Sequence, residues 1–279
     1  MKKTNLNVLY GLIFIIIIFL TLLTYSFLGS LPSIDQNADE NPQQIINRDF
    51  SFRAAIIDHL SVSDPSPWFI ETATNILKAA NFTVDYYPRE KVTINLYRNL
   101  AASNYGLIIF RVHSGREPVT FFFSGEYYNG TAFVPQQLND QIGKAWLPED
   151  EQLYFSIKPL FVKYAMTGSF YKTVIIALGC GSLSTMDMAE AFIEKGAAVY
   201  IGWDRSLDAF HGDLATLGLL NHLLLERSTV NEAVQTAMEE VGPVPSSELG
   251  TTSTLSFYPI GSGNYRIPYS TNFSQTSNP

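Results

Sequence analysis

The sequence predicts an α/β domain, built on a mostly parallel sheet with helices on both faces and preceded by one transmembrane helix. Three observations lead to this prediction. From residue 53 onward, short apolar runs alternate with helical patterns, which is typical of a parallel sheet. Val8–Leu28 holds 21 residues without a charge. Of the 279 residues, 46% are hydrophobic and 13% are aromatic, so a substantial core can form.

Composition and charge exclude some classes of protein. The formal net charge is −8 and the sequence pI is near 5.0, whereas a nucleic-acid-binding surface needs cations that neutralise phosphates. We therefore expect no nucleic-acid partner. Cys180 is the single cysteine, so no intrachain disulfide can form. We expect no cofactor and no metal site, since His211 and His222 lie about three helical turns apart, too far to share an ion.

The first 52 residues predict a membrane anchor and a stalk. A bilayer span takes ~20 apolar residues, whereas the core of a signal peptide usually has ~7–15. We therefore predict a cytoplasmic N-terminus over residues 1–7, a signal anchor over 8–28 and a polar stalk over 29–52. Two lysines before the anchor predict that the rest of the chain lies outside the cytoplasm, at the cell membrane. Cleavage at the small residues of Ser26–Ser30 is the alternative.

The domain predicted over residues 53–269 begins with strands and helices in alternation. We expect strands at Ala54–Asp58, Phe82–Tyr87 and Tyr105–Val112, with helices at Ser66–Ala80 and Thr93–Ala102. The proline after Ser66 fits the first position of a helix.

Residues 117–172 interrupt the alternation and predict an inserted β region. We expect a hairpin of Val119–Phe123 and Glu126–Tyr128. The pattern of Glu149–Lys163 is ambiguous, and a second β-rich piece at Tyr154–Ile157 and Leu160–Val162 is one interpretation of it. The C-terminal part predicts two helices, a last strand and a loose tail, at Leu207–Glu226, Val230–Val241, Thr254–Ile260 and residues 270–279.

The stretch Thr173–Trp203 predicts a strand, a turn, a helix and a second strand. Its first six residues are apolar and rich in β-branched types, and they end at the small residues Gly179–Ser182. Ser184 and Asp187 have the spacing of a capping box, which predicts that a helix begins there. The turn carries Cys180 and lies at the carboxyl edge of the predicted sheet, where sites are built in parallel sheets.

His113 and Cys180 are the candidate catalytic residues, because each follows a core strand. The thiolate is the nucleophilic form of cysteine, and it needs a nearby base or a positive potential. Strand ends of one sheet lie side by side, so an imidazole and a thiol can face each other there. Backbone N–H groups of Ser114, Gly115 and Cys180 can form an oxyanion hole. The alternative is a structural role, since a lone cysteine commonly packs as a small hydrophobe.

Three more residues at strand ends are candidates for the cleft. Asp58 and Asp204 can select a basic residue of a substrate, although carboxylates at loop starts are more often caps or solvated charges. His59 either lines the cleft or occupies a polar surface position.

These motifs resemble the caspase-fold (clan CD) cysteine peptidases, nearest their gingipain-like and clostripain-like prokaryotic branches. The resemblance covers about Phe52–Val241 and consists of a strand before His113-Ser114-Gly115, a strand before Cys180-x-Ser, and a later strand ending in Ile201-Gly202-Trp203. It implies a caspase-hemoglobinase-like fold, His113 as the catalytic histidine, Cys180 as the nucleophile and the Ser114 N–H as an oxyanion donor.

The sequence departs from the family in two places. Most members have glycine where Ser114 stands, and Gly179-Cys180-Gly181 is not the Q-A-C-x-G of caspases proper. The order of the candidates excludes α/β-hydrolases and class I amidotransferases, in which the nucleophile precedes the histidine.

The predicted function is that of a membrane-anchored, extracytoplasmic cysteine endopeptidase. It would hydrolyse a peptide or protein substrate with a Cys180–His113 dyad, through an acyl-enzyme. The alternative is a catalytically inactive module of the same fold that binds a partner protein at the cell surface.

Overall fold

A computed structural model of the chain describes residues 49–116, 118–148, 150–246 and 250–269. The predicted membrane anchor, the tail and all but the last residues of the predicted stalk lie outside the described residues. Within those ranges, no helix is long and apolar enough to cross a membrane. The membrane anchor therefore stays a prediction.

Six strands form the central sheet of the described residues, in the order β12-β9-β8-β3-β1-β2. Five of them pair in parallel, and β12 runs antiparallel to β9. This confirms the predicted α/β fold with a mostly parallel sheet. The strands are β1 (Arg53–Asp58), β2 (Thr83–Pro88), β3 (Leu107–Arg111), β8 (Val174–Leu178), β9 (Val199–Trp203) and β12 (Leu255–Tyr258).

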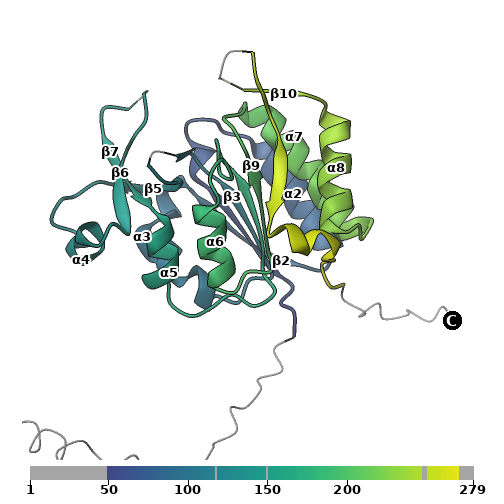
Figure 1. Cartoon of the computed structure of the whole chain (residues 1–279), viewed down its shortest axis with the longest axis horizontal. Coiled ribbons are helices and arrows are strands. Elements are labelled where there is room, and N and C mark those ends of the chain that lie inside the picture. Colours follow the sequence, from purple (N-terminus) through teal and green to yellow (C-terminus); the bar gives the residue numbers. More distant parts are fainter. Residues whose placement is uncertain (1–48, 117, 149, 247–249, 270–279) are drawn as a thin grey trace, which may run out of the picture. The chain divides into compact units, whose positions relative to one another are not determined.

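Helices cover both faces of this sheet, as the sequence predicts (Figure 1). Side chains alternate along β3, so Ile108 and Phe110 pack into one hydrophobic layer while Leu107 and Ile109 pack into the other. Because both faces are covered, polar side chains of the sheet can gather at the strand ends. The first layer contains α3 (Ile94–Asn99), α5 (Pro159–Tyr164) and α6 (Asp187–Glu194), and the second contains α2 (Pro67–Ala79), α7 (Ala209–Leu220) and α8 (Val230–Val241).

A second, smaller sheet follows β3 in the chain, where the sequence predicts an inserted β region. Its four strands lie in the order β4-β5-β7-β6 and pair antiparallel. They are β4 (Ser114–Gly115), β5 (Phe121–Tyr127), β6 (Ile142–Trp146) and β7 (Leu153–Ile157).

Two details of that region differ from the prediction. The hairpin predicted from Val119–Phe123 and Glu126–Tyr128 is wrong, because β5 runs through both segments, with a register irregularity in its pairing to β7. Leu160–Val162 lies in α5 and not in a strand, since Pro159 occupies the first turn and favours a helix there.

The helix after Cys180 begins later than predicted. α6 starts at Asp187, and the residue before it, Met186, makes no side-chain cap, although the Asp187 carboxylate accepts the N–H of Met188 (2.7 Å). The hydroxyl of Ser184 donates to the carbonyl oxygen of Gly181 (2.8 Å), and the Asp187 carboxylate accepts the N–H of Thr120 (3.1 Å). The predicted capping box is therefore wrong, because both of its side chains have other partners. The positive end of α6 lies seven residues beyond the cysteine.

The region predicted as one helix, Leu207–Glu226, is divided. α7 begins after Asp208, whose carboxylate accepts the backbone N–H of His211, and a π-helical segment follows at Asn221–Leu225. α8 has the predicted bounds and begins with a capping box. The shorter α-helix and strands of the described residues are α4 (Val134–Leu138), β10 (Val244–Pro245) and β11 (Thr252–Ser253), and short 3₁₀ segments lie between other elements.

Candidate active site

His113 and Cys180 follow the carboxyl ends of two neighbouring strands. In the parallel ladder of β3 and β8, Arg111 is the partner of Leu178 in the last pair. Each candidate stands two residues beyond its member of that pair, so both segments continue at the same level of the sheet edge. Because adjacent strands lie about 4.8 Å apart, the two segments run side by side where they leave the sheet.

The two segments stay in contact beyond the ladder. Val112 N–H donates to the carbonyl oxygen of Leu178 at 3.2 Å, and the hydroxyl of Ser114 donates to the carbonyl oxygen of Cys180 at 2.7 Å. A Cβ atom at Gly179 would lie 2.6 Å from the Ser114 hydroxyl and 2.7 Å from the carbonyl oxygen of Val112. Glycine is therefore required for this approach, and the serine that departs from the family pattern bridges the two segments.

The imidazole of His113 is half-buried and is held by a residue that the sequence reasoning missed. Its Nε2 lies 3.0 Å from the hydroxyl of Ser63, in the loop between β1 and α2. The ring also packs against Phe123, with 5.8 Å between ring centroids. Ser63 gives no motif signal, but it follows the last residue of β1 by five positions, at the edge where sites form.

The Cys180 side chain is half-buried, and its thiol lies against the loop before α7. The thiol donates to the carbonyl oxygen of Leu207 at 3.7 Å, a weak hydrogen bond. Ser182 fixes the turn, because its buried hydroxyl donates to the carbonyl oxygen of Ala177 (2.8 Å) and accepts the N–H of Trp203 (3.0 Å). These two bonds attach the residues after the thiol to β8 and β9.

The three predicted oxyanion donors are not equivalent. The N–H of Phe123 donates to the carbonyl oxygen of His113 at 3.1 Å, so Ser114 and its partner in β5 form a non-hydrogen-bonded pair. In such a ladder the next residue, Gly115, exchanges hydrogen bonds with its partner, while the Ser114 N–H points away from β5. The N–H of Gly115 is therefore used in the hydrogen bonds between β4 and β5, whereas the N–H of Ser114 does not take part in them.

His59 is fully buried and packs against the ring of His113. The two rings are edge to face with 5.5 Å between centroids, and Phe123 lies 5.6 Å from His59. Among the described residues, neither ring nitrogen of His59 makes a hydrogen bond of good geometry. Burial, together with His113 and Arg89, lowers the pKa of His59 to about 3, so the ring is neutral at physiological pH. The surface position expected as one alternative is wrong, because aromatic rings enclose this side chain.

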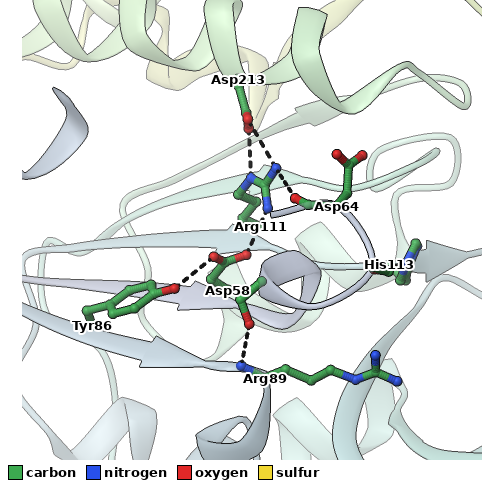
Figure 2. A network of polar contacts seen from close by, with 9 residues as sticks. Asp58, Asp64, Tyr86, Arg89, Arg111, His113 and Asp213 are labelled. Atoms are coloured by element: carbon green, nitrogen blue, oxygen red, sulfur yellow. Dashed lines mark hydrogen bonds and ion pairs between the residues drawn. The ribbon is translucent and has the colours of Figure 1, made fainter. Parts of the chain in front are cut away.

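A buried ion network lies beneath these residues (Figure 2). The guanidinium of Arg111 donates to both carboxylate oxygens of Asp213 in α7, at 2.8 and 3.1 Å, and to Asp58 at 3.0 Å. Its Nη2 also donates to the carbonyl oxygen of Asp64 at 2.9 Å. Two carboxylates share one cation. Burial raises the pKa of Asp58 and of Asp213, although Arg111 opposes the effect.

The two candidate substrate-binding carboxylates already have partners in the chain. Asp58 accepts hydrogen bonds from Arg111 and from the hydroxyl of Tyr86 (3.1 Å), and it borders a cavity of about 440 Å³ beside α2. Asp204 accepts the N–H of Thr254 at 2.7 Å, and its side chain is 41% exposed. Asp58 is therefore a buried carboxylate with both oxygens engaged, whereas Asp204 is half exposed and lies 4.0 Å from the guanidinium of Arg205.

The described residues define a mixed α/β protein with a largely parallel sheet. Among solved structures, the chain is similar to the crystal structure of the Arg-specific cysteine proteinase gingipain R, with a TM-score of 0.47 and 11% identity over 79% of this chain. The match covers 48% of that structure, so the chain spans about half its length. No protein-family model and no curated protein matches the chain. The likeness concerns the fold alone, and residue roles are argued from this chain's own geometry.

Proposed function

We propose that the chain is a cysteine endopeptidase in which Cys180 and His113 form a catalytic dyad. The observation that carries the proposal is the register of β3 and β8, in which both candidates stand two residues beyond the pair Arg111–Leu178. The contact between Ser114 and the carbonyl of Cys180, at 2.7 Å, supports the same juxtaposition. A peptide or protein is the substrate class that this chemistry serves.

In the proposed reaction, the thiolate of Cys180 attacks the carbonyl carbon of the scissile peptide bond. The C–N bond breaks, the leaving amine takes a proton from the imidazolium of His113, and a thioester acyl-enzyme remains. Neutral His113 then accepts a proton from a water molecule, and the oxygen of that water attacks the carbonyl carbon of the thioester. The C–S bond breaks, the acid product leaves, and the thiolate and imidazolium are restored.

The two nitrogens of His113 take different roles in this proposal. Ser63 bonds Nε2 at 3.0 Å, so we assign the exchange of protons with thiol, amine and water to Nδ1. The hydroxyl fixes the rotation of the ring, as the third member of a nucleophile–base–orienter arrangement does.

For the oxyanion hole, the geometry favours two of the three predicted donors. The Ser114 N–H points away from β5, and the Cys180 N–H belongs to the nucleophile itself, as in other oxyanion holes that include the nucleophile's backbone. Gly115 is engaged in the ladder, so we leave it out of the proposed hole.

The predicted location and specificity remain part of the proposal. We propose that the signal anchor over residues 8–28 holds the catalytic domain outside the cytoplasm at the membrane. Asp58 forms a buried ion pair with Arg111 at 3.0 Å, whereas the ion pair of Asp204 with Arg205 is half exposed and longer, at 4.0 Å. We therefore propose Asp204 as the stronger of the two candidates for selecting a basic residue.

The test is peptide hydrolysis by the full chain in detergent, with a fluorogenic library that varies the residue before the scissile bond. Cys180→Ala and His113→Ala should each abolish hydrolysis while keeping the wild-type circular dichroism spectrum. His211→Ala removes an exposed imidazole on α7 and should retain the activity. Hydrolysis that survives in Cys180→Ala would overturn the dyad. A folded wild type that hydrolyses no member of the library would favour the inactive binding module.

A further inference from the structure

We infer that Arg111 is a positioning residue for His113, acting through the carbonyl of Asp64 and the hydroxyl of Ser63. The inference rests on the proposed function, because His113 matters here as the base of the dyad. It assigns a role in that reaction to the buried ion network.

The geometry forms a closed ring of contacts between one strand and one loop. Arg111 and His113 flank Val112 at the end of β3. The guanidinium holds the carbonyl oxygen of Asp64 at 2.9 Å, and the preceding residue, Ser63, lies 3.0 Å from Nε2 of His113. The loop between β1 and α2 is thus attached to β3 at two adjacent points. Figure 2 shows Arg111 between its carboxylates with the backbone of Asp64 beside it.

The guanidinium itself is held from several sides. Asp213 binds it through two oxygens from α7, Asp58 binds it from β1, and the ring of Phe69 in α2 lies 5.7 Å from its central carbon. Tyr86 in β2 holds the second oxygen of Asp58. A guanidinium held by side chains from three elements can place the Asp64 carbonyl accurately, because its planar fork leaves little freedom of orientation.

Stability alone is a weak explanation for such a network. Replacing a buried ion cluster by apolar side chains of similar volume is often neutral or stabilising, because the charges lose their hydration. Here the ion cluster lies at the same edge of the sheet as the candidate site, and Arg111 donates a hydrogen bond to the loop that carries Ser63. Without this attachment the loop could shift, and the imidazole of His113 would rotate away from the orientation that the dyad needs.

The experiment is a double-mutant cycle on the reactivity of the thiol. The wild type, Ser63→Ala, Arg111→Lys and the double variant are prepared as full chains in detergent, and the rate of alkylation of Cys180 by iodoacetamide is measured from pH 6 to 9. Cys180 is the single thiol of the chain, so the label reports it alone. Lysine keeps the positive charge for the two carboxylates but lacks the fork that reaches the Asp64 carbonyl.

If Arg111 acts through Ser63, each single variant should slow alkylation at neutral pH by roughly three- to tenfold, the scale of one lost hydrogen bond. The double variant should then be no slower than Ser63→Ala. Ser63→Thr keeps the hydroxyl and should restore the wild-type rate. Effects of the two substitutions that multiply in the double variant would overturn the inference, as would a wild-type rate in Arg111→Lys.

Two control variants and one substitute variant keep the outcome interpretable. Tyr86→Phe removes a bond to the same network at Asp58 without touching the loop, and it should leave the alkylation rate within about twofold of wild type. If Arg111→Lys does not fold, Asp213→Asn, which keeps the side-chain shape and loosens the guanidinium, replaces it in the same cycle. His113→Ala separates the two claims, because an unchanged rate there refutes the proposed dyad, whereas a slowed rate with multiplying effects refutes the positioning role alone.

Discussion

The burial of His59 predicts a pH dependence of stability that one substitution removes. The imidazole is fully buried against His113, Phe123 and Tyr154. Among the described residues its nitrogens make no hydrogen bond of good geometry, and a backbone contact with Ser124 offsets only a small part of the effect of burial on its pKa. Protonation would place an uncompensated charge in this aromatic pocket, so the folded chain keeps the ring neutral. His59→Leu replaces the ring by an apolar side chain that has no titration.

The sign and the size follow from the pKa of His59, which is about 3 in the folded chain and 6.5 for an unperturbed histidine. Between these values the unfolded chain binds a proton at His59 that the folded chain does not. The free energy of unfolding therefore falls as the pH falls below 6.5. One pH unit corresponds to about 1.4 kcal/mol. From pH 7.5 to pH 5 the wild type should lose about 2 kcal/mol more than His59→Leu.

The assay is urea denaturation of the full chain in detergent, followed by tryptophan fluorescence at pH 5, 6 and 7.5. His222→Gln serves as a control of opposite sign. Burial lowers the pKa of His222, but Glu226 (2.8 Å) and Glu240 (3.1 Å) raise it overall, so its stabilisation is present below pH 6.5 and is lost as the pH rises through the folded-state value. His222→Gln should thus lose more stability than wild type on acidification. Parallel pH dependences of wild type and His59→Leu would refute the account of His59.

Three further predictions concern the strand contact, the topology and the specificity. Gly179→Ala introduces a Cβ 2.6 Å from the Ser114 hydroxyl, so it should lower the free energy of unfolding by about 1–3 kcal/mol and slow alkylation of the thiol; wild-type values for both would contradict the close contact. Protease added to intact cells should digest the domain and spare a short anchor-bearing fragment, whereas a domain protected until lysis would reverse the predicted orientation. Substrate profiling of Asp204→Asn should show a weaker preference for Arg or Lys than wild type or Asp58→Asn, and an unchanged profile in Asp204→Asn would remove that residue from the pocket.

The sheet could be predicted because its signals are local. The strands ending before Cys180 and His113 have five residues each and are apolar except for Arg111, and the turn after Leu178 is rich in glycine. Alternation with helical patterns predicted parallel pairing, and parallel pairing predicts that strand ends share an edge. The two candidates were accordingly predicted at one edge, and the ladder brings their segments there.

The contacts around the candidates could not be predicted, because their partners lie far away in the sequence. Arg111 and Asp213 are 102 residues apart, and Ser63 and His113 are 50 residues apart. From the sequence alone, the arginine at the end of β3 only interrupts an apolar strand, because the two carboxylates that pair with it lie elsewhere in the chain. The capping box failed because the Asp187 carboxylate accepts hydrogen bonds from Thr185 and from the N–H of Met188, as well as from the distant Thr120, and not from the backbone of Ser184.

The most direct test of the dyad is the rate at which iodoacetamide alkylates Cys180 at pH 7. The thiolate is the nucleophilic form of cysteine, and the proposed dyad supplies a base that accepts the proton of the thiol, so the thiol should react faster than a free one. We predict that the wild type reacts about tenfold faster than free cysteine and that His113→Ala returns the rate to that of free cysteine or below. A thiol in the folded wild type that reacts no faster than free cysteine, with a rate that His113→Ala leaves unchanged, would contradict the proposed peptidase mechanism.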